Sequence, residues 1–547
     1  MGLGPGDGAV EGTPLGRAHG HSFVAGALIL VAGSLGSRLL GATYRIILPI
    51  LMGGGQRAAV GMGLYQMAYP MFLLAVTLIT TGFPLAVSKL VAARLAEDDA
   101  DGAHAVFAAA RLALPVFGLL FAAALWFLAP LIAHDVAHDV RAVLPIRAIS
   151  PAVLTVSFAS AYRGAFQGKE DMRPYAVSQI IEQIGRVFTM FALVIALLPL
   201  GIAVAAAGAS FGAVIGGIFS FGTCLWFWPR AGLRVPQAPR THRSLRPVLG
   251  QVLGLAIPIA LSASVLPLFN LSDAIIVPLR LAAAGLGHQA IALYGVLTGY
   301  ASPLVLAPTV FTAALSMSLL PSVAAALASG DRQGSVRNVR AGLRLAMLFA
   351  LPAAVGLGLV SGLVPRLLFH ASDAARPLVA LCPALVFLSL QQTSSGVLQG
   401  LGRPDISVRN LVIGGIAKVA IAWWLVGIPA WNVSGAAIST SVAFLIACVL
   451  NIGAVQRRIG GVVDWDGMLL RPALATVVMG ALVLLAEWAL VRHGLLVETG
   501  GALGVGVVGY VVALPLVGGL RRDDLELLPR VGPRVAVHLA RWGLLRA

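Results

Sequence analysis

Charged residues stand inside long apolar stretches of this chain, at spacings that place them on one helix face. Arg38 and Arg45 are seven residues apart in the apolar run 23–52. Asp273 and Arg280 are seven apart in a later run. Seven residues fall about 20° short of two turns, so each pair shares a face about 10 Å apart. A mid-membrane charge costs at least about 2.5–3.5 kcal/mol, which predicts that these arginines face a polar cavity. The alternatives are that Arg45 snorkels to an interface or that Arg38 pairs permanently with Asp273.

Other charged groups leave more than one interpretation open. Glu182 and Arg186 are four residues apart, a spacing at which an acid and a base neutralise each other within one helix. We expect a structural pair first and cavity lining second. Asp273 is compatible with a fixed counter-ion and equally with an ion or proton site. Lys418 stands alone, and it either reaches an interface or has a role in function.

The composition identifies the elements that hold these residues. The chain of 547 residues is 59% hydrophobic and 11% charged, with a mean hydropathy of +0.92, whereas soluble domains carry roughly a quarter charged residues. This predicts an all-α polytopic membrane protein. With about 20 residues as the unit, fourteen apolar runs are predicted: 23–52, 64–90, 105–133, 144–167, 175–199, 202–228, 248–281, 289–321, 338–363, 377–400, 406–426, 430–455, 469–492 and 499–520.

Several kinds of site are not predicted. The three cysteines lie in apolar segments without metal-ligand spacing, and no GxxxxGK[ST] loop occurs. No constellation for bond-making catalysis is present either. The sequence therefore predicts no metal, no cofactor and no enzyme activity.

Lysine and arginine are concentrated in alternate connections, which orients the chain with both termini in the cytoplasm. The net charge of +16 fits this bias and contact with anionic lipid head groups, without nucleic acid. The basic connections are those near 89–94, 169–173, 230–246, 332–344, 403–409 and 457–471.

An internal repeat divides the chain into two parallel halves. The segment from Arg163, "RGAFQGKEDMRPYAVSQIIEQIGRV", resembles "SGVLQGLGRPDISVRNLVIGGIAKV" from Ser395, and "LAEDDADG" resembles "LASGDRQG", both at a shift of 232. Parallel repeats with a site between them are typical of secondary transporters. The predicted organisation is a disordered tail 1–22, an N-lobe 23–228, a basic linker 229–247, a C-lobe 248–455, two further spans in 456–520, and a basic tail 521–547.

Prolines recur at matching places in both halves. They predict broken helices, because the lost hydrogen bonds must be satisfied by neighbouring groups or cavity water. We expect the broken helices to be the moving elements. The prolines are Pro49, Pro70, Pro84, Pro278, Pro303 and Pro308.

Three segments carry a family resemblance: "SRLLGATYRIILPILMG", "GLYQMAYPMFLLAVTLITTGFPLAVSKLVA" and the segment from Arg163. They resemble the SpoVB group of the superfamily that includes MurJ lipid II flippases, Wzx flippases and MATE drug exporters. The resemblance implies two six-helix lobes in a V, two further helices, and alternating access for a polyprenyl-pyrophosphate-linked saccharide. It carries the family's cationic cavity over to Arg38. Its second arginine would fall at Tyr44, and here Arg45 comes one residue later.

The predicted function is a flippase for a lipid-linked anionic saccharide in cell-wall or polysaccharide synthesis, including sporulation. Its predicted partners are that substrate, membrane lipids and a coupling Na⁺ or H⁺, and the chain is expected to act as a monomer. The alternatives are a MATE-like cation antiporter and a non-transporting membrane partner of wall or spore-coat assembly. The predicted substrate-binding residues are Arg38, Arg45, Arg280, Asp273, Glu182 and Arg186.

Overall fold

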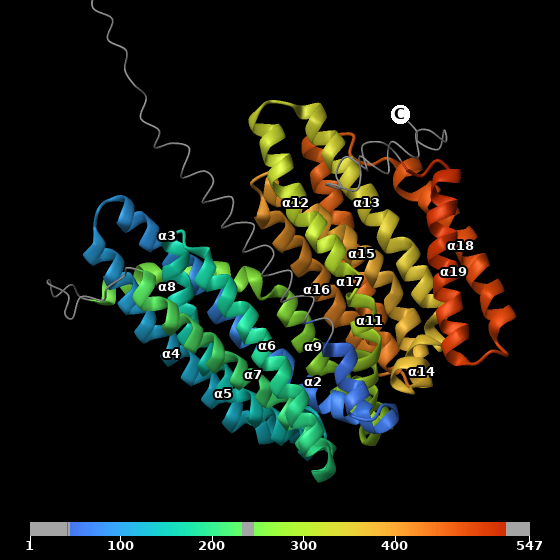
Figure 1. Cartoon of the computed structure of the whole chain (residues 1–547), viewed down its shortest axis with the longest axis horizontal. Coiled ribbons are helices and arrows are strands. Elements are labelled where there is room, and N and C mark those ends of the chain that lie inside the picture. The colour runs from blue at the N-terminus through green and yellow to red at the C-terminus, as the bar shows by residue number, and fades with distance from the viewer. Residues whose placement is uncertain (1–40, 42–43, 232–244, 521–547) are drawn as a thin grey trace, which may run out of the picture.

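The fold is a bundle of helices in two lobes with an outer pair. The computed structural model describes residue 41 and residues 44–231 and 245–520, and no strand occurs among them. Figure 1 shows the two groups of helices separated at the top and converging at the bottom. The N-lobe helices are α2 (Gly55–Thr77), α3 (Phe83–Ala96), α4 (Ala100–Leu131), α5 (Val143–Gly168), α6 (Met172–Leu197) and α7 (Ile202–Phe227).

The second lobe follows a connecting helix, α8 (Leu245–Ala263). Its helices are α9 (Val265–Leu281), α10 (Ala290–Gly295), α11 (Ser302–Leu306), α12 (Thr309–Ala328), α13 (Arg332–Leu359), α14 (Val364–Phe369), α15 (Ala375–Gly400), α16 (Pro404–Leu425) and α17 (Asn432–Ile459). The single-turn elements are η1 (Leu78–Gly82), η2 (Ile132–Val136), η3 (Val140–Ala142), η4 (Leu198–Leu200), η5 (Trp228–Ala231), η6 (Ala282–Leu286), η7 (Gly287–Gln289), η8 (Val296–Ala301), η9 (Val360–Gly362), η10 (Ser372–Ala374) and η11 (Asp466–Leu470).

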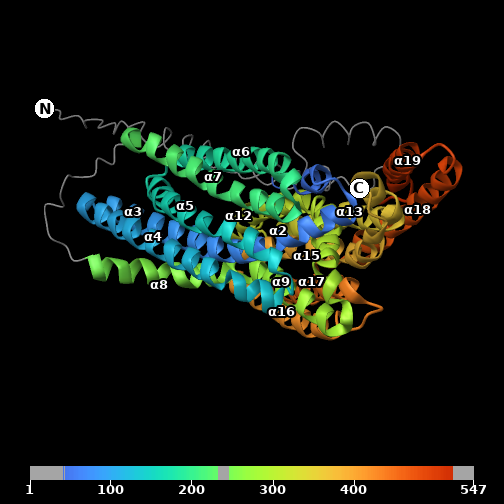
Figure 2. The ribbon, with the colours of Figure 1, turned by 90° about the horizontal axis from the view of Figure 1, so that it is seen from below.

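The last two helices stand apart from both halves of the repeat. α18 (Arg471–Leu490) and α19 (Leu495–Leu516) pack on each other, and α18 packs on α13. Figures 1 and 2 both place this pair at the outer end of the C-lobe, opposite α3 and α4. Its outer surface is apolar, with Trp488 80% exposed, as suits contact with lipid.

The internal repeat holds at the level of single helix starts. α4, α5 and α6 begin 232 residues before α13, α15 and α16 respectively (100 and 332, 143 and 375, 172 and 404). The caps repeat as well. Asp99 accepts a hydrogen bond from Gly102 N at 2.8 Å, and Asp331 accepts one from Gly334 N at 2.7 Å. Each cap satisfies one of the free N–H groups at a helix start.

Glycines let equivalent helices approach closely in both halves. Gly164 of α5 lies against Pro84 of α3, and Gly396 of α15 lies against Ser316 of α12. The two contacts are equivalent under the shift of 232, because Pro84 corresponds to Ser316 and Gly164 corresponds to Gly396. The packing of the two halves therefore follows the same sequence register.

Both lobes contain a helix interrupted by a wide turn just before a proline. The π-helical η1 precedes Pro84, and the π-helical η8 precedes Pro303. Proline removes one backbone donor and its ring clashes with the preceding turn, and the extra residue of a π-turn accommodates both effects. The broken helices predicted from the prolines are present at these two places and at Pro308, which lies between α11 and α12. Pro70 and Pro278 instead lie inside the continuous helices α2 and α9, so the breaks predicted there are absent.

The count of spans agrees with the prediction, but its assignment along the chain does not. Fourteen helical stretches in the described part are long and apolar enough to cross a membrane. The predicted run 23–52 lies mostly outside the described residues. The runs 248–281 and 289–321 instead form three stretches, because the helices break at Ser264 and before Thr309. The middle stretch, Val265–Leu306, also contains a kink at Gly285, whose φ is 82°.

The break at Ser264 separates α8 from α9, and the two helices pack against different lobes. α8 packs on α3 and α4, whereas α9 packs on α16 and α2. Residues 245–263, predicted to belong to the C-lobe from 248 onward, therefore lie against the N-lobe. The reason is the bend itself, since a straight helix could not follow both lobes as they diverge.

The lobes meet where α2 crosses α10. Gly63 lies against the backbone of Ile291, and Gly295 lies against the backbone of Ala59. Tyr300 in η8 donates a 2.6 Å hydrogen bond to the carbonyl oxygen of Gly55. Small residues on both helices permit this close crossing, which closes one side of the space between the lobes.

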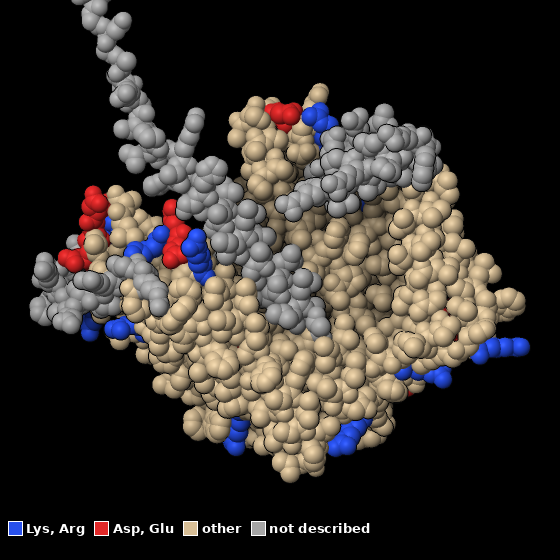
Figure 3. Space-filling view, viewed as in Figure 1, with Lys and Arg blue, Asp and Glu red and all other residues tan. Residues whose placement is uncertain are grey.

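Charge is distributed as a membrane protein requires. In Figure 3, acidic and basic side chains gather at the upper and lower edges of the visible face, and a band of uncharged atoms lies between them. The same view shows the face hollowed between the two lobes. The charged groups within that hollow are therefore exceptions in an apolar region.

Candidate functional site

The first of these groups is Arg45, which lies in the helical residues that precede Gly53 and Gly54. Its guanidinium carbon is 5.6 Å from the ring centroid of Tyr69 on α2. A guanidinium over an aromatic face is held in place by the ring quadrupole while its N–H donors remain available at the edge. The side chain therefore points inward between the lobes.

Arg186 reaches the same ring from α6. Its guanidinium carbon is 5.5 Å from the centroid of Tyr69 and 5.2 Å from that of Phe72. Its Nε is buried and has no hydrogen-bond partner among the residues that the structure describes. Two cations thus share one aromatic side chain, although they come from helices more than 100 residues apart in sequence.

These two arginines line a cavity of about 510 Å³ between the lobes. No aspartate or glutamate is among the described residues that line it. Two like charges with no carboxylate between them in the described lining repel each other and lower the energy of any anion that enters. The residues that supply its main polar groups are Tyr44, Arg45, Tyr69, Gln183, Arg186 and Gln392.

A second cavity of about 270 Å³ adjoins the first, with Arg45, Tyr69 and Gln392 lining both. On its far side lies an ion pair: Lys418 Nζ is 2.5 Å from Asp273 Oδ1. The ammonium also donates to the carbonyl oxygen of Phe269 at 2.8 Å. The side chain of Lys418 is 1% exposed and that of Asp273 is 16% exposed. Asp273 is therefore paired with Lys418 in this structure. The alternative partner, Arg38, lies outside the described residues.

The location of Lys418 excludes one of its two predicted roles. It is buried in the C-lobe wall and does not reach a membrane interface. The sequence held a signal for this, because Lys418 follows Arg186 by the repeat shift of 232 and closes the aligned segments as "GRV" and "AKV". Each half therefore places one cation at the same position of equivalent helices, Arg186 on α6 and Lys418 on α16.

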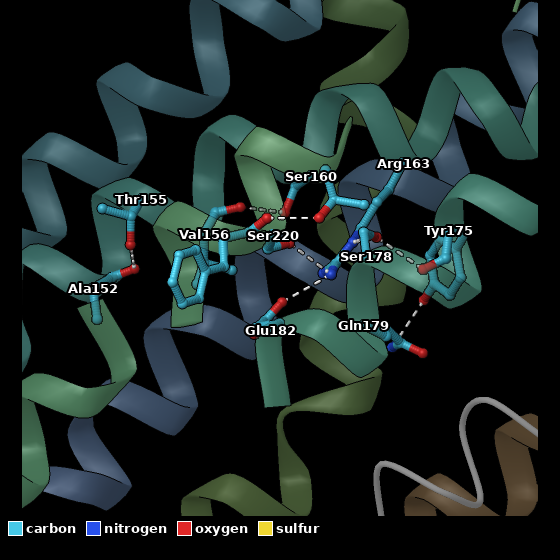
Figure 4. Close-up of polar contacts among 12 residues, drawn as sticks. Ala152, Thr155, Val156, Ser160, Arg163, Tyr175, Ser178, Gln179, Glu182 and Ser220 are labelled. Atoms are coloured by element: carbon cyan, nitrogen blue, oxygen red, sulfur yellow. Dashed lines mark hydrogen bonds and ion pairs between the residues drawn. The ribbon is translucent and has the colours of Figure 1, made fainter. Parts of the chain in front are cut away.

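Glu182 was predicted to pair with Arg186 or to line the cavity; in this structure its ion pair is with Arg163, and it is not among the residues that line the two cavities described above. Its Oε2 accepts a 2.8 Å hydrogen bond from Nη2 of Arg163 on α5. Figure 4 shows the carboxylate beside the guanidinium of Arg163, which Ser178 of α6 and Ser220 of α7 also face. The two hydroxyls accept hydrogen bonds of 2.9 and 2.8 Å from Arg163.

The reason for this choice of partner is the burial of Arg163, which is only 5% exposed. A buried guanidinium without an anion would be strongly destabilising, whereas Arg186 keeps contact with the cavity. The sequence identifies Arg163 only as the first residue of a repeated segment and not as a candidate charged group. Local spacing cannot predict its ion pair, because the acid, Glu182, lies on the next helix.

Arg280 is not brought to either cavity. Its Nε donates to the carbonyl oxygen of Trp423 at 2.8 Å, and its guanidinium carbon lies 4.9 Å from the centroid of that indole. These contacts hold it against α16, and it is not among the described residues that line the two cavities, so its predicted role in substrate binding stays a prediction. Arg38 lies outside the described residues.

A two-lobed helical bundle with a charged cavity between parallel repeats defines a membrane transport protein. The chain belongs to the polysaccharide biosynthesis protein family, whose model matches residues 23–326. This agrees with the resemblance drawn from the three sequence segments.

Individual proteins extend the similarity over almost the whole chain. Stage V sporulation protein B of Bacillus subtilis (strain 168) is 27% identical over 520 residues, which cover 94% of this chain and 98% of that protein. Lipid II flippase MurJ of the same organism is 27% identical over 493 residues, which cover 85% of this chain and 88% of that protein. A solved structure of lipid II flippase MurJ in an inward closed conformation has a TM-score of 0.62 at 14% identity, covering 89% of this chain and 98% of the other. That structure supports the fold.

Proposed function

We propose that this protein moves a polyprenyl-pyrophosphate-linked saccharide across the cytoplasmic membrane by alternating access, as a monomer. The observation that carries the proposal is the convergence of Arg45 and Arg186 on a cavity whose described lining contains no carboxylate. A pyrophosphate carries at least two negative charges and accepts bidentate hydrogen bonds from guanidinium groups. The names of the relatives, a lipid II flippase and a sporulation protein, are consistent with such a cargo.

The ion pairs weigh against a cation antiporter of the MATE kind. Such a protein needs an acid that is free to bind a cation or proton in its cavity. Here Glu182 is neutralised by Arg163, and Asp273 by Lys418. A non-transporting role is also disfavoured, because it gives no reason to keep two guanidinium groups in an apolar space.

The proposed orientation places both termini in the cytoplasm, and it can be tested on two exposed turns. A membrane-impermeant maleimide should label His288→Cys near the Gly285 turn in intact cells. It should label Ser329→Cys, in the basic turn before α13, only after the membrane is permeabilised. Both positions are exposed. Labelling of the two from the same side would contradict the orientation.

The function itself is tested in proteoliposomes that contain the purified protein. A fluorescent undecaprenyl-pyrophosphoryl saccharide should become accessible in the opposite leaflet faster than in protein-free vesicles. A cationic dye should not be moved by the same vesicles. Na⁺ and H⁺ gradients applied in turn identify any coupling ion. Dye movement without lipid movement would replace the proposal with the antiporter.

A further inference from the structure

The two parts of the inter-lobe space differ in chemistry. The larger part presents two guanidinium groups, Arg45 and Arg186. The smaller part, next to the C-lobe, shares Arg45 with it and is otherwise lined by the Asp273–Lys418 ion pair, uncharged polar groups and aromatic rings. Its uncharged polar residues include Gln66, Asn270, Thr298, Thr309, Gln392 and Thr440. An anion-binding wall thus continues into a wall suited to a neutral, hydroxyl-rich group.

Several of these polar groups have hydrogen-bonding capacity left to offer. Thr298 and Thr440 donate their hydroxyl protons to carbonyl oxygens of their own helices at 2.7 and 3.0 Å, which leaves oxygen lone pairs as acceptors. Gln392 accepts a 3.1 Å hydrogen bond from Thr312 through Oε1, which leaves its two amide N–H donors. The amides of Gln66 and Asn270 have no hydrogen-bond partner within the described part of the chain, and Asn270 is exposed to the cavity.

The ion pair makes this wall unattractive to phosphate. Lys418 is enclosed behind Asp273, and the carboxylate is the charged group of the pair that keeps some exposure. A carboxylate repels a phosphate and accepts hydrogen bonds from hydroxyl groups. The repeat-equivalent position in the N-lobe, Arg186, has no such acid beside it in the cavity lining. The electrostatic difference between the two walls therefore orients a head group that has an anionic end and a neutral end.

Aromatic rings complete the smaller cavity. Tyr69, Phe269, Tyr294 and Phe444 contribute to its lining. Pockets that combine apolar ring surface with a few well-placed polar groups fix the orientation of small ligands. A sugar ring has such a mixture, with C–H groups on its faces and hydroxyl groups at its edge.

We propose that this smaller cavity is the subsite for the sugar attached to the pyrophosphate, with Asn270 as a residue that recognises it. The inference rests on the proposed function. The pyrophosphate lies on Arg45 and Arg186, and the first sugar extends toward α9 and α17. Asn270 supplies both an amide donor and a carbonyl acceptor to adjacent hydroxyl or acetamido groups.

The test compares two lipids that differ only in the sugar. Undecaprenyl pyrophosphate and undecaprenyl-pyrophosphoryl-N-acetylglucosamine are titrated into purified wild-type protein and Asn270→Leu. We expect wild type to bind the sugar-bearing lipid about tenfold more tightly, the effect of one or two net hydrogen bonds. In Asn270→Leu the two affinities should become nearly equal, while binding of the bare lipid stays at the wild-type value. Thr440→Val, on α17 in the lining of the same cavity, should reduce the sugar preference without changing bare-lipid binding.

The matched control is Asn338→Leu, an asparagine inside α13 that is not part of the cavity lining. It should retain the full preference. Equal affinities of wild type for the two lipids would overturn the sugar subsite and leave the proposed function standing. Binding of neither lipid would overturn both proposals.

Discussion

Replacing Arg186 with glutamine is expected to weaken binding of undecaprenyl pyrophosphate about ten- to a hundredfold, because a charge-assisted hydrogen bond contributes roughly 1.5–3 kcal/mol. Glutamine keeps a polar side chain of similar reach but removes the charge and the planar fork. Arg186→Lys should restore only part of the affinity, since an ammonium cannot make two parallel hydrogen bonds to one phosphate. Arg45→Gln should behave similarly. The measurement is lipid titration of the purified protein, followed by transport in vesicles.

A suitable control is Arg147→Gln. Arg147 also lies over an aromatic ring, 5.4 Å from the centroid of Trp126, and it donates to a carbonyl oxygen at 3.4 Å. It lines neither cavity, so its loss should leave binding unchanged. If Arg147→Gln and Arg186→Gln reduced affinity equally, the effect would come from general charge and not from the cavity.

Replacing Glu182 with methionine is expected to destabilise the protein by about 3 kcal/mol. Removing one member of a buried ion pair leaves the other charge uncompensated, which typically costs about 3–5 kcal/mol. The lower figure applies because the Glu182 side chain is 22% exposed. Thermal unfolding in detergent, followed by fluorescence, measures the loss.

The double variant Arg163→Met and Glu182→Met should recover most of that stability, since both charges are then absent. The C-lobe supports this expectation. The positions equivalent to Arg163 and Ser178 under the shift of 232 are Ser395 and Asn410, which belong to neutral hydrogen-bonded contacts. A double variant less stable than Glu182→Met would show that Arg163 is needed for something other than its ion pair.

The sequence was informative wherever a feature depends on local order along the chain. The shift of 232 places helix starts, caps and glycine contacts, because each is set by a few neighbouring residues that the repeat preserves. Prolines predicted the broken helices for the same reason. The cationic cavity followed from the cost of burying Arg45, which leaves few other places for it.

Partners that come from other helices could not be predicted in this way. The 3.6-residue period aligned Glu182 with Arg186, but the period says nothing about Arg163 on the adjacent helix. Asp273 and Lys418 are 145 residues apart, and only the packing of α9 on α16 brings them together. Arg280 shares a helix face with Asp273, yet it lies at the end of α9, where a tryptophan and a free carbonyl bind it instead.

Cysteine protection shows whether the arginine-lined cavity holds the pyrophosphate of a lipid-linked saccharide. Gln183 lines the larger cavity beside Arg186 and can carry the single cysteine of a variant whose native Cys224, Cys382 and Cys448, all buried, are replaced by alanine. If the pyrophosphate occupies this cavity, an undecaprenyl-pyrophosphoryl saccharide should slow labelling of Gln183→Cys by a thiol reagent, whereas undecaprenol should not. A cysteine at the exposed Gln289 should label at the same rate with either lipid. Equal labelling of Gln183→Cys with and without the pyrophosphate lipid, at concentrations that support transport, would show that the pyrophosphate does not bind in this cavity.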